Sequence, residues 1–264
     1  MAWLETHLDL QPARPASGWR NIAIGTWRAA KDPSVYGVLE LPVDKVREYI
    51  AEVSAVTGER VTITRFVGKA VSESLRRHPE VNCVLRFGKL YPRSHITLFF
   101  QVATDPEGKD LSGVTVRDSE HKTVAQIAGE MNPRVNAVRD RSDRTYAQMK
   151  GLMGRLPGWL TGTVLDLASL IQYGFNWWSP LFGTPKDPMG SVMITNVGSL
   201  GLEFAFAPLV PYSRVPIIVT QCAVKDQVVV QDGKLEILPM LRLCVTFDHR
   251  LIDGAHAAKL SKVM

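Results

Sequence analysis

The spacing of apolar and polar residues along the chain separates helical segments from extended ones. Apolar residues recur at helical spacing in several stretches. Gly58 follows one of these stretches and Pro79 follows another, and both residue types commonly end helices. This periodicity predicts helices at 19–31, Val43–Val56, Thr62–Arg77, Val124–Met149 and Ala255–Lys262, with Pro133 kinking or restarting the fourth. Alternating or β-branched runs predict strands at Ser34–Leu41, His95–Thr104, Val114–Arg117, Ser191–Asn196, Val215–Val224, Gln227–Val230 and Leu241–Phe247, and a hairpin at 82–92.

The order of these elements predicts a fold class. Helices alternate with strands in the first half of the chain, whereas strands cluster in the second half, which favours an α+β (mixed α/β) domain. Residues 1–18 contain two prolines and a glycine and predict an extended N-terminal arm. We therefore expect a single large domain over 19–264.

The pattern changes between about 151 and 188. Residues 156–182 are almost wholly apolar and carry one charge, Asp166. The segment nearly reaches membrane-spanning length, but its glycines and Asp166 argue against a span and favour two short helices or an interfacial hairpin. Three roles remain open for this apolar segment: packing on the protein surface, a lipophilic pocket, and peripheral membrane contact through 156–182.

The composition and charge of the chain limit the classes of partner that we expect it to bind. Apolar residues make up 45% of the chain and charged residues 22%, as in ordinary soluble domains, and the net charge is +5. Acidic residues interrupt the densest basic group, Arg139, Arg141 and Arg144, so we predict a solvated helix face and no nucleic-acid partner. A mild positive charge favours anionic ligands.

The cysteines indicate a reducing compartment. Cys83, Cys222 and Cys244 are far apart, lie among apolar residues and form no C-x-x-C pair, so we expect buried thiols without a disulfide framework or a metal site. The first five residues lack the pattern of a secretory signal, and we predict a cytoplasmic location.

One segment places a histidine where it can do chemistry. The strand Leu241–Phe247 leads into Asp248-His249-Arg250-Leu251-Ile252-Asp253-Gly254, and then into a helix. Histidine is the usual general base near neutral pH. Gly254 would allow the backbone to turn where a side chain would collide. By spacing alone, a polar turn with an incidental histidine remains an equal alternative.

This segment resembles the D-H-R-x-x-D-G signature of the catalytic domain of 2-oxo acid dehydrogenase dihydrolipoamide acyltransferases. It is also similar to the H-H-x-x-x-D-G motif of chloramphenicol acetyltransferase and the wider CoA-dependent acyltransferase superfamily. Residues 191–198 resemble the family's T-[IV]-[ST]-N-L-G strand, and Pro79-Glu80-Val81-Asn82 matches P-E-[VL]-N. The resemblance covers roughly 19–150 and 187–264, which implies that the apolar segment is an insertion at about 151–188. It would pack on the subunit or trimer surface, form a lipophilic acyl pocket, or contact a membrane.

The resemblance implies a site. His249 would be the general base that takes a proton from CoA or dihydrolipoamide, and Thr195 would donate a hydrogen bond to the tetrahedral oxyanion. Asp253 would fix the histidine loop by pairing with an N-terminal arginine, for which Arg20 is the candidate and Arg28 the alternative. For Asn196 a structural role is favoured over a direct one.

The resemblance also implies an architecture. It predicts a chloramphenicol acetyltransferase-like mixed sheet flanked by helices, assembled as a homotrimer or a multiple of trimers with each site between two subunits. CoA or acyl-CoA would be the substrate, without a metal. No D-K-A lipoylation motif occurs, so a lipoyl group would come from another protein. The possible partners are a lipoyl-bearing protein or dehydrogenase subunits. The alternatives are a non-catalytic core or scaffold of such a complex, and a membrane-associated acyltransferase with a lipophilic substrate.

Overall fold

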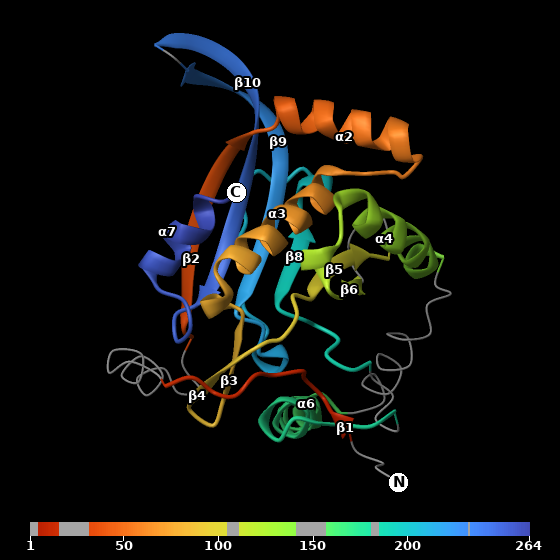
Figure 1. Cartoon of the computed structure of the whole chain (residues 1–264), viewed down its shortest axis with the longest axis vertical. Helices are drawn as coiled ribbons and strands as arrows, with labels where there is room; N and C mark the ends of the chain where they lie inside the picture. Colours follow the sequence, from red (N-terminus) through yellow and green to blue (C-terminus); the bar gives the residue numbers. More distant parts are fainter. Residues whose placement is uncertain (1–4, 16–31, 105–110, 141–156, 181–184, 232) are drawn as a thin grey trace.

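The computed structural model describes residues 5–15, 32–104, 111–140, 157–180, 185–231 and 233–264 (Figure 1). The strands are β1 (Glu5–Thr6), β2 (Ser34–Pro42), β3 (Cys83–Arg86), β4 (Lys89–Pro92), β5 (Leu98–Ala103), β6 (Leu111–Val116), β7 (Trp177–Trp178), β8 (Val192–Asn196), β9 (Ile217–Gln231) and β10 (Lys234–Asp248). The α-helices are α2 (Asp44–Thr57), α3 (Ile63–Arg77), α4 (Val124–Arg139), α6 (Gly158–Ser169) and α7 (Gly254–Ser261). Shorter turns are the 3-10 helices η1 (Pro79–Val81), η2 (Ser119–His121), η5 (Gly198–Leu200) and η6 (Pro211–Ser213), and the π turn η3 (Leu170–Gly174).

A mixed sheet forms the centre of the fold. Its strand order is β2-β10-β9-β8-β5-β6, in which β8 runs parallel to both β5 and β9 and the other neighbours are antiparallel. Strands β9 and β10 form a long hairpin that projects beyond the rest of the sheet (Figure 1). The predicted fold class, a mixed sheet flanked by helices, is therefore confirmed.

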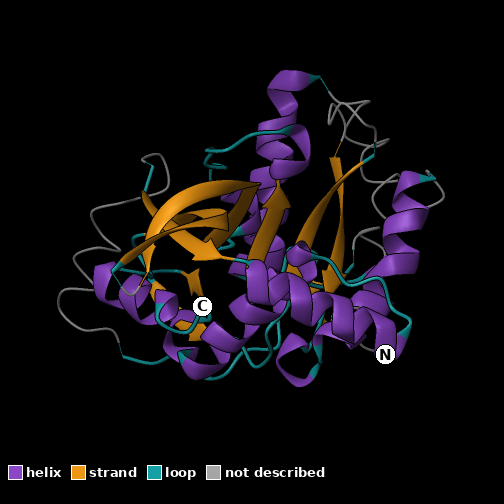
Figure 2. Ribbon diagram, turned by 90° about the horizontal axis from the view of Figure 1, so that it is seen from above, coloured by secondary structure: helices purple, strands orange, loops and turns teal. Residues whose placement is uncertain are grey.

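The main core lies between the sheet and the helices. Val67, Val71 and Leu75 follow one another at a spacing of four residues on α3, so they form one buried stripe. Val192 and Ile194 alternate on β8 and contribute to the same core. Figure 2 shows most helical segments lying along one side of the curved strands.

Several predicted boundaries differ from the structure. The helix predicted at 19–31 lies entirely outside the described residues, as do the last residues of the one predicted at Val124–Met149. Helix α4 continues through Pro133, so the predicted restart is wrong. The strands predicted at 215–224 and 227–230 form one continuous strand, β9, and β10 begins seven residues earlier than predicted.

The described part of the apolar segment folds as helix α6, the π turn η3 and the short strand β7, whereas two short helices or an interfacial hairpin were predicted. Strand β7 pairs with β1, which ties this segment to the N-terminal residues. Leu167, Phe175 and Trp177 are each about half exposed on its surface, at 56%, 46% and 50%. Among the described residues, none of the helices has the length and apolar character needed to cross a membrane.

Candidate active site

The loop that carries His249 is fixed at both ends by backbone hydrogen bonds. His249 N–H donates to the Pro33 carbonyl at 2.9 Å, which joins the loop to the residue before β2. The N–H groups of Leu251 and Ile252 donate to the Asp248 carbonyl at 3.0 and 2.9 Å. The end of β10 therefore turns tightly and holds the histidine backbone in place.

The neighbours of His249 in the signature stabilise this turn. The Asp248 carboxylate accepts hydrogen bonds from Arg250 N–H at 3.0 Å and from the Arg250 guanidinium at 3.0 and 2.7 Å. Asp248 is buried, so this charged pair is shielded from solvent. Sequence reasoning assigned neither residue a role, although the Asp-x-Arg spacing is compatible with a local side-chain-to-backbone turn.

A contact of the His249 ring indicates its tautomer. Nδ1 lies 3.0 Å from the Ile252 carbonyl oxygen. A carbonyl oxygen can only accept, so Nδ1 carries the hydrogen, and in the neutral ring the lone pair is on Nε2. The ring is partly buried, so its orientation is held by this contact and by the surrounding turn. This is the tautomer in which Nε2 can act as a base.

Asp253 caps the helix that follows. Its carboxylate accepts from His256 N–H at 3.1 Å and contacts His256 Nδ1 at 2.6 Å. His256 Nδ1 also lies 3.4 Å from the Asp253 backbone nitrogen. One ring nitrogen cannot both donate and accept, so we assign the shorter contact, in which Nδ1–H donates to the Asp253 carboxylate. Asp253 is thus the N-cap of α7, and the His256 ring is bound to its carboxylate. Arg20 and Arg28, the predicted partners of Asp253, lie outside the described residues.

Gly254 does not have the steric role expected of it. It is the first residue of α7, and a Cβ built there would meet nothing within 4 Å in this chain. Its φ is also not positive. The expectation that a side chain would collide at this position is therefore wrong for the single subunit.

Thr195 and Asn196 point to opposite faces of the sheet. Ile194 belongs to the main core, so the alternation of β8 places Thr195 on the face away from the helices. Thr195 is partly buried, and no described residue forms a hydrogen bond with its hydroxyl. Asn196 donates from Nδ2 to Thr64 Oγ1 at 3.0 Å and accepts from Ser199 N–H at 3.2 Å. Asn196 therefore anchors β8 to the start of α3.

Thr195 and His249 of one chain are not adjacent. Thr195 pairs with Thr220, which pairs with Cys244, and His249 lies five positions beyond Cys244. At about 3.3 Å per residue, this offset corresponds to roughly 16 Å along the strands, and the two intervening strand spacings add about 10 Å across the sheet. Strands β8 and β10 run in opposite directions (Figure 1), so the two side chains lie towards opposite ends of the sheet. They cannot contact one substrate atom from the same subunit.

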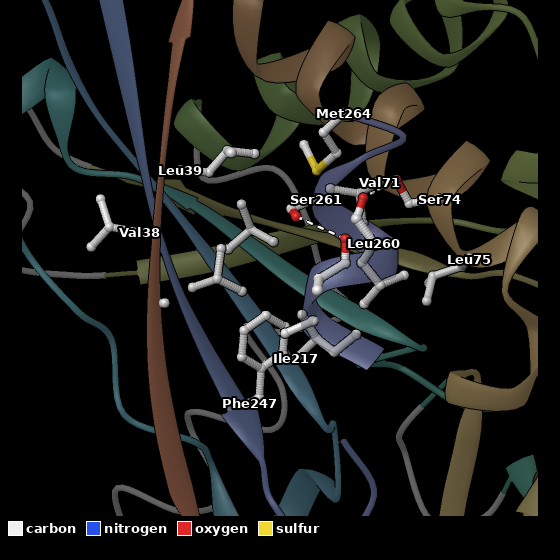
Figure 3. Close-up of a pocket in the computed structure, with 15 residues that line it drawn as sticks. Val38, Leu39, Val71, Ser74, Leu75, Ile217, Phe247, Leu260, Ser261 and Met264 are labelled. Atoms are coloured by element: carbon white, nitrogen blue, oxygen red, sulfur yellow. Dashed lines mark hydrogen bonds between the residues drawn. The ribbon is translucent and has the colours of Figure 1, made fainter. Parts of the chain in front are cut away.

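An apolar cavity of about 230 Å³ lies beside the strand that carries His249 (Figure 3). Residues of β2, β9, β10, α3 and α7 line it, among them Val38, Ile217, Phe247, Leu260 and Met264. None of the described residues of the apolar segment lines this cavity. The acyl pocket that the sequence associated with residues 151–188 is therefore not this cavity.

The cysteines are buried, as predicted. Cys222 and Cys244 lie on adjacent strands with their Sγ atoms 3.7 Å apart, and Cys83 is also buried and forms no disulfide. Burial raises the pKa of the Cys244 thiol, which keeps it protonated. These thiols contribute to the core and are poor candidates for nucleophiles.

Comparisons with known proteins point to one family. The family profile described as 2-oxoacid dehydrogenases acyltransferase (catalytic domain) matches residues 13–152 and 185–264 and leaves out 153–184. The dihydrolipoyllysine-residue acetyltransferase component of the pyruvate dehydrogenase complex of Bacillus subtilis is 25% identical over 213 residues, which cover 80% of this chain and 38% of that protein. The chain thus spans well under half the length of this curated relative.

Solved structures share the fold. The dihydrolipoamide acetyltransferase of Azotobacter vinelandii superposes with a TM-score of 0.64 at 20% identity, covering 96% of this chain and 94% of that chain. A chloramphenicol acetyltransferase superposes with a TM-score of 0.56 at 12% identity, covering 96% and 97%. The chloramphenicol acetyltransferase-like fold predicted from the sequence is confirmed.

Proposed function

Since this chain belongs to the 2-oxoacid dehydrogenase acyltransferase family through its catalytic domain, we propose that it moves an acyl group between a thioester and a thiol, with His249 as the general base. The observation that carries this proposal is the contact between His249 Nδ1 and the Ile252 carbonyl. It directs the lone pair of the imidazole to Nε2, while the turn around Asp248 holds the ring in position. A scaffold without catalysis would not require this arrangement.

The proposed reaction is a thioester exchange. Nε2 of His249 takes the proton from the acceptor thiol of CoA or dihydrolipoamide, and the thiolate attacks the carbonyl carbon of the acyl thioester. The Thr195 hydroxyl donates a hydrogen bond to the resulting oxyanion; a donor of this kind typically contributes about 3 kcal/mol. When the intermediate collapses, the departing thiolate takes the proton back from the imidazolium. A lipoyl group, if it is the carrier, would be supplied by another protein.

We propose that each site forms between two subunits of a trimer or a multiple of trimers. The separation of Thr195 and His249 within one chain supports this, because a complete site then needs His249 from one subunit and Thr195 from a neighbouring subunit. The β9–β10 hairpin supplies a surface for such contact. Val228 pairs with Ile237 and Val230 with Leu235, and these four side chains are 66–76% exposed. Paired apolar residues on a projecting hairpin are typical of an interface.

The test is acetyl exchange between acetyl-CoA and dihydrolipoamide by the purified protein. We expect turnover by the wild type and its loss in His249→Gln, which keeps a similar size and polarity. His256→Gln is the matched control, because His256 lies in the same region but its ring contacts the Asp253 carboxylate that caps α7. Absence of turnover in the wild type with several acyl-CoA donors would favour the scaffold. Equal turnover by His249→Gln would refute the assignment of the base.

A further inference from the structure

A second cavity, small and polar, lies between the N-terminal segment and residues that flank β5 and β6. Its volume is about 130 Å³, and it is formed by four segments far apart in the sequence. His7 comes from the N-terminal segment, Arg93 from the end of β4, Arg117 from the end of β6, and Asp187 from the segment that precedes β8. The catalytic proposal does not use any of these residues.

His7 is fully buried against this cavity. Its exposed fraction is 0%, and neither ring nitrogen has a hydrogen-bond partner among the described residues. The residue is fixed by its N–H, which donates to the Asn176 carbonyl at 2.9 Å, and by an edge contact with the Tyr173 ring. Burial lowers the pKa of His7 to about 4, so at neutral pH the ring offers one N–H donor and one lone pair.

Arg93 presents a vacant edge of its guanidinium. The side chain is 4% exposed, and Nη1 donates to Asp187 Oδ2 at 2.6 Å. Nε and Nη2 have no hydrogen-bond partner, although both are buried. These two nitrogens lie on the same edge of the planar group, which is the edge that binds two oxygens of a carboxylate or phosphate.

Asp187 adds an acceptor beside these donors. Its Oδ2 is bound to Arg93, but Oδ1 is buried without a partner. A buried carboxylate oxygen without a hydrogen bond is costly, so a ligand that supplies a hydroxyl would be favoured there. An anion without a proton would instead place its own oxygen against Oδ1.

We propose that this cavity binds a small oxyanion that retains a hydroxyl group, of the hydrogen phosphate class. Two of its oxygens accept from Nε and Nη2 of Arg93, His7 donates to a third oxygen, and the hydroxyl donates to Asp187 Oδ1. Arg117 and Lys186 also line the cavity, and they favour an anion over a cation. Asp9 and Asp118 lie at the exposed rim and disfavour large anionic molecules.

The nearby group of His95, Asp118 and Glu120 does not change this assignment. Their ligand atoms lie within 4.8 Å of one another, as a metal site would require. However, His95 and Asp118 are exposed and already paired with each other at 2.9 Å, and the guanidinium groups of Arg93 and Arg117 line the same cavity. A divalent cation would meet these positive charges.

The test compares phosphate with sulfate at constant ionic strength, by calorimetric titration and thermal unfolding of the full chain. Near neutral pH phosphate retains a proton and sulfate does not. We expect phosphate to bind about 10- to 100-fold more tightly, because only phosphate satisfies Asp187 Oδ1. At a free phosphate concentration about 100-fold above its Kd, the Tm should rise by about 5 °C.

The variant that tests the geometry is Asp187→Asn, since the amide can donate to an unprotonated oxyanion. We expect it to remove the preference for phosphate, whereas Glu203→Gln, which alters an exposed ion pair elsewhere, should retain it. If Asp187→Asn does not fold, the His7 ring resonances of the wild type provide the answer, because phosphate should shift them and sulfate should not.

Three results would overturn the proposal. Equal effects of phosphate and sulfate on the wild type would indicate a cavity filled with water and a general salt effect. An unchanged preference in Asp187→Asn would place phosphate elsewhere. Binding of glycerol 3-phosphate as tight as that of phosphate would refute a site closed to larger molecules.

Discussion

Two inactive variants should restore activity when their subunits exchange. Thr195→Ala removes the proposed oxyanion donor and His249→Ala removes the base, and the two residues lie at opposite ends of the sheet in one chain. A mixed trimer would contain interfaces that join an intact His249 from one subunit to an intact Thr195 from the next. Each variant alone has no such interface.

The expected recovery follows from random mixing. At equal proportions, an interface receives its histidine from the Thr195→Ala chain in half of cases and its threonine from the His249→Ala chain in half of cases. About a quarter of the interfaces should then be complete, which corresponds to about a quarter of the wild-type rate per subunit. The assay is acetyl exchange, measured before and after exchange of subunits that is verified by mass spectrometry.

A second mixture provides the control. This control mixes wild-type chains equally with the double variant Thr195→Ala/His249→Ala. If sites lie between chains, subunit exchange should lower the rate of the mixture from about half to about a quarter of the full wild-type rate. If each site lies within one chain, the rate should stay near half. No recovery in the first mixture, together with no decrease in the second, would refute the shared site.

The remaining predictions concern single residues. His249→Ala should lower kcat by about 10²- to 10⁴-fold without unfolding the protein, as measured by steady-state kinetics and circular dichroism. Thr195→Ala should lower kcat by about 10²- to 10³-fold, and Thr195→Ser should retain most activity; equal losses in both would exclude the hydroxyl as the donor. Asp253→Ala should destabilise the fold by about 1 kcal/mol in urea unfolding, and Asp253→Asn by less, because asparagine also caps helices. Burial lowers the pKa of His7 from 6.5 to about 4, so its contribution to stability should be complete above pH 6.5 and decline as the pH falls towards 4; a His7→Gln variant that kept the same pH dependence would refute this.

The sequence predicted the position of the histidine but not the contacts that orient it. The strand ending before Asp248 follows from the apolar run, and the signature identifies His249. The contact with the Ile252 carbonyl depends on the dihedral angles of the turn, which residue types alone do not specify. The role of His256 as the partner of the Asp253 carboxylate was missed because histidine is not the Glu or Gln that usually occupies this position.

The strand predicted from Leu241 missed the first seven residues of β10, which include Pro239. A proline inside a run of residues argues against a central strand, yet Pro239 lies within β10. In the structure the pairing with β2 ends at Met240, and Pro239 lies beyond it, where β9 is the paired strand. Pro239 is therefore paired on one side only, with β9. The sequence alone could not show this, because it does not give the register in which β10 pairs with β2.

The pairing of β2 with β10 determines when this sheet can be completed during synthesis. Glu40 and Arg242 form an ion pair across these strands although they are 202 positions apart in the chain. A ribosome therefore releases β2 long before its partner strand exists, with Leu39 and Leu41, which pack against the main core in the folded chain, still uncovered. Contacts of such high sequence separation form slowly, and a waiting apolar strand is a target for aggregation. Of the six strands described in this sheet, β10 is made last, and its end brings His249 to the Pro33 carbonyl, so we expect nascent chains to depend on chaperones until the His249 loop has been made.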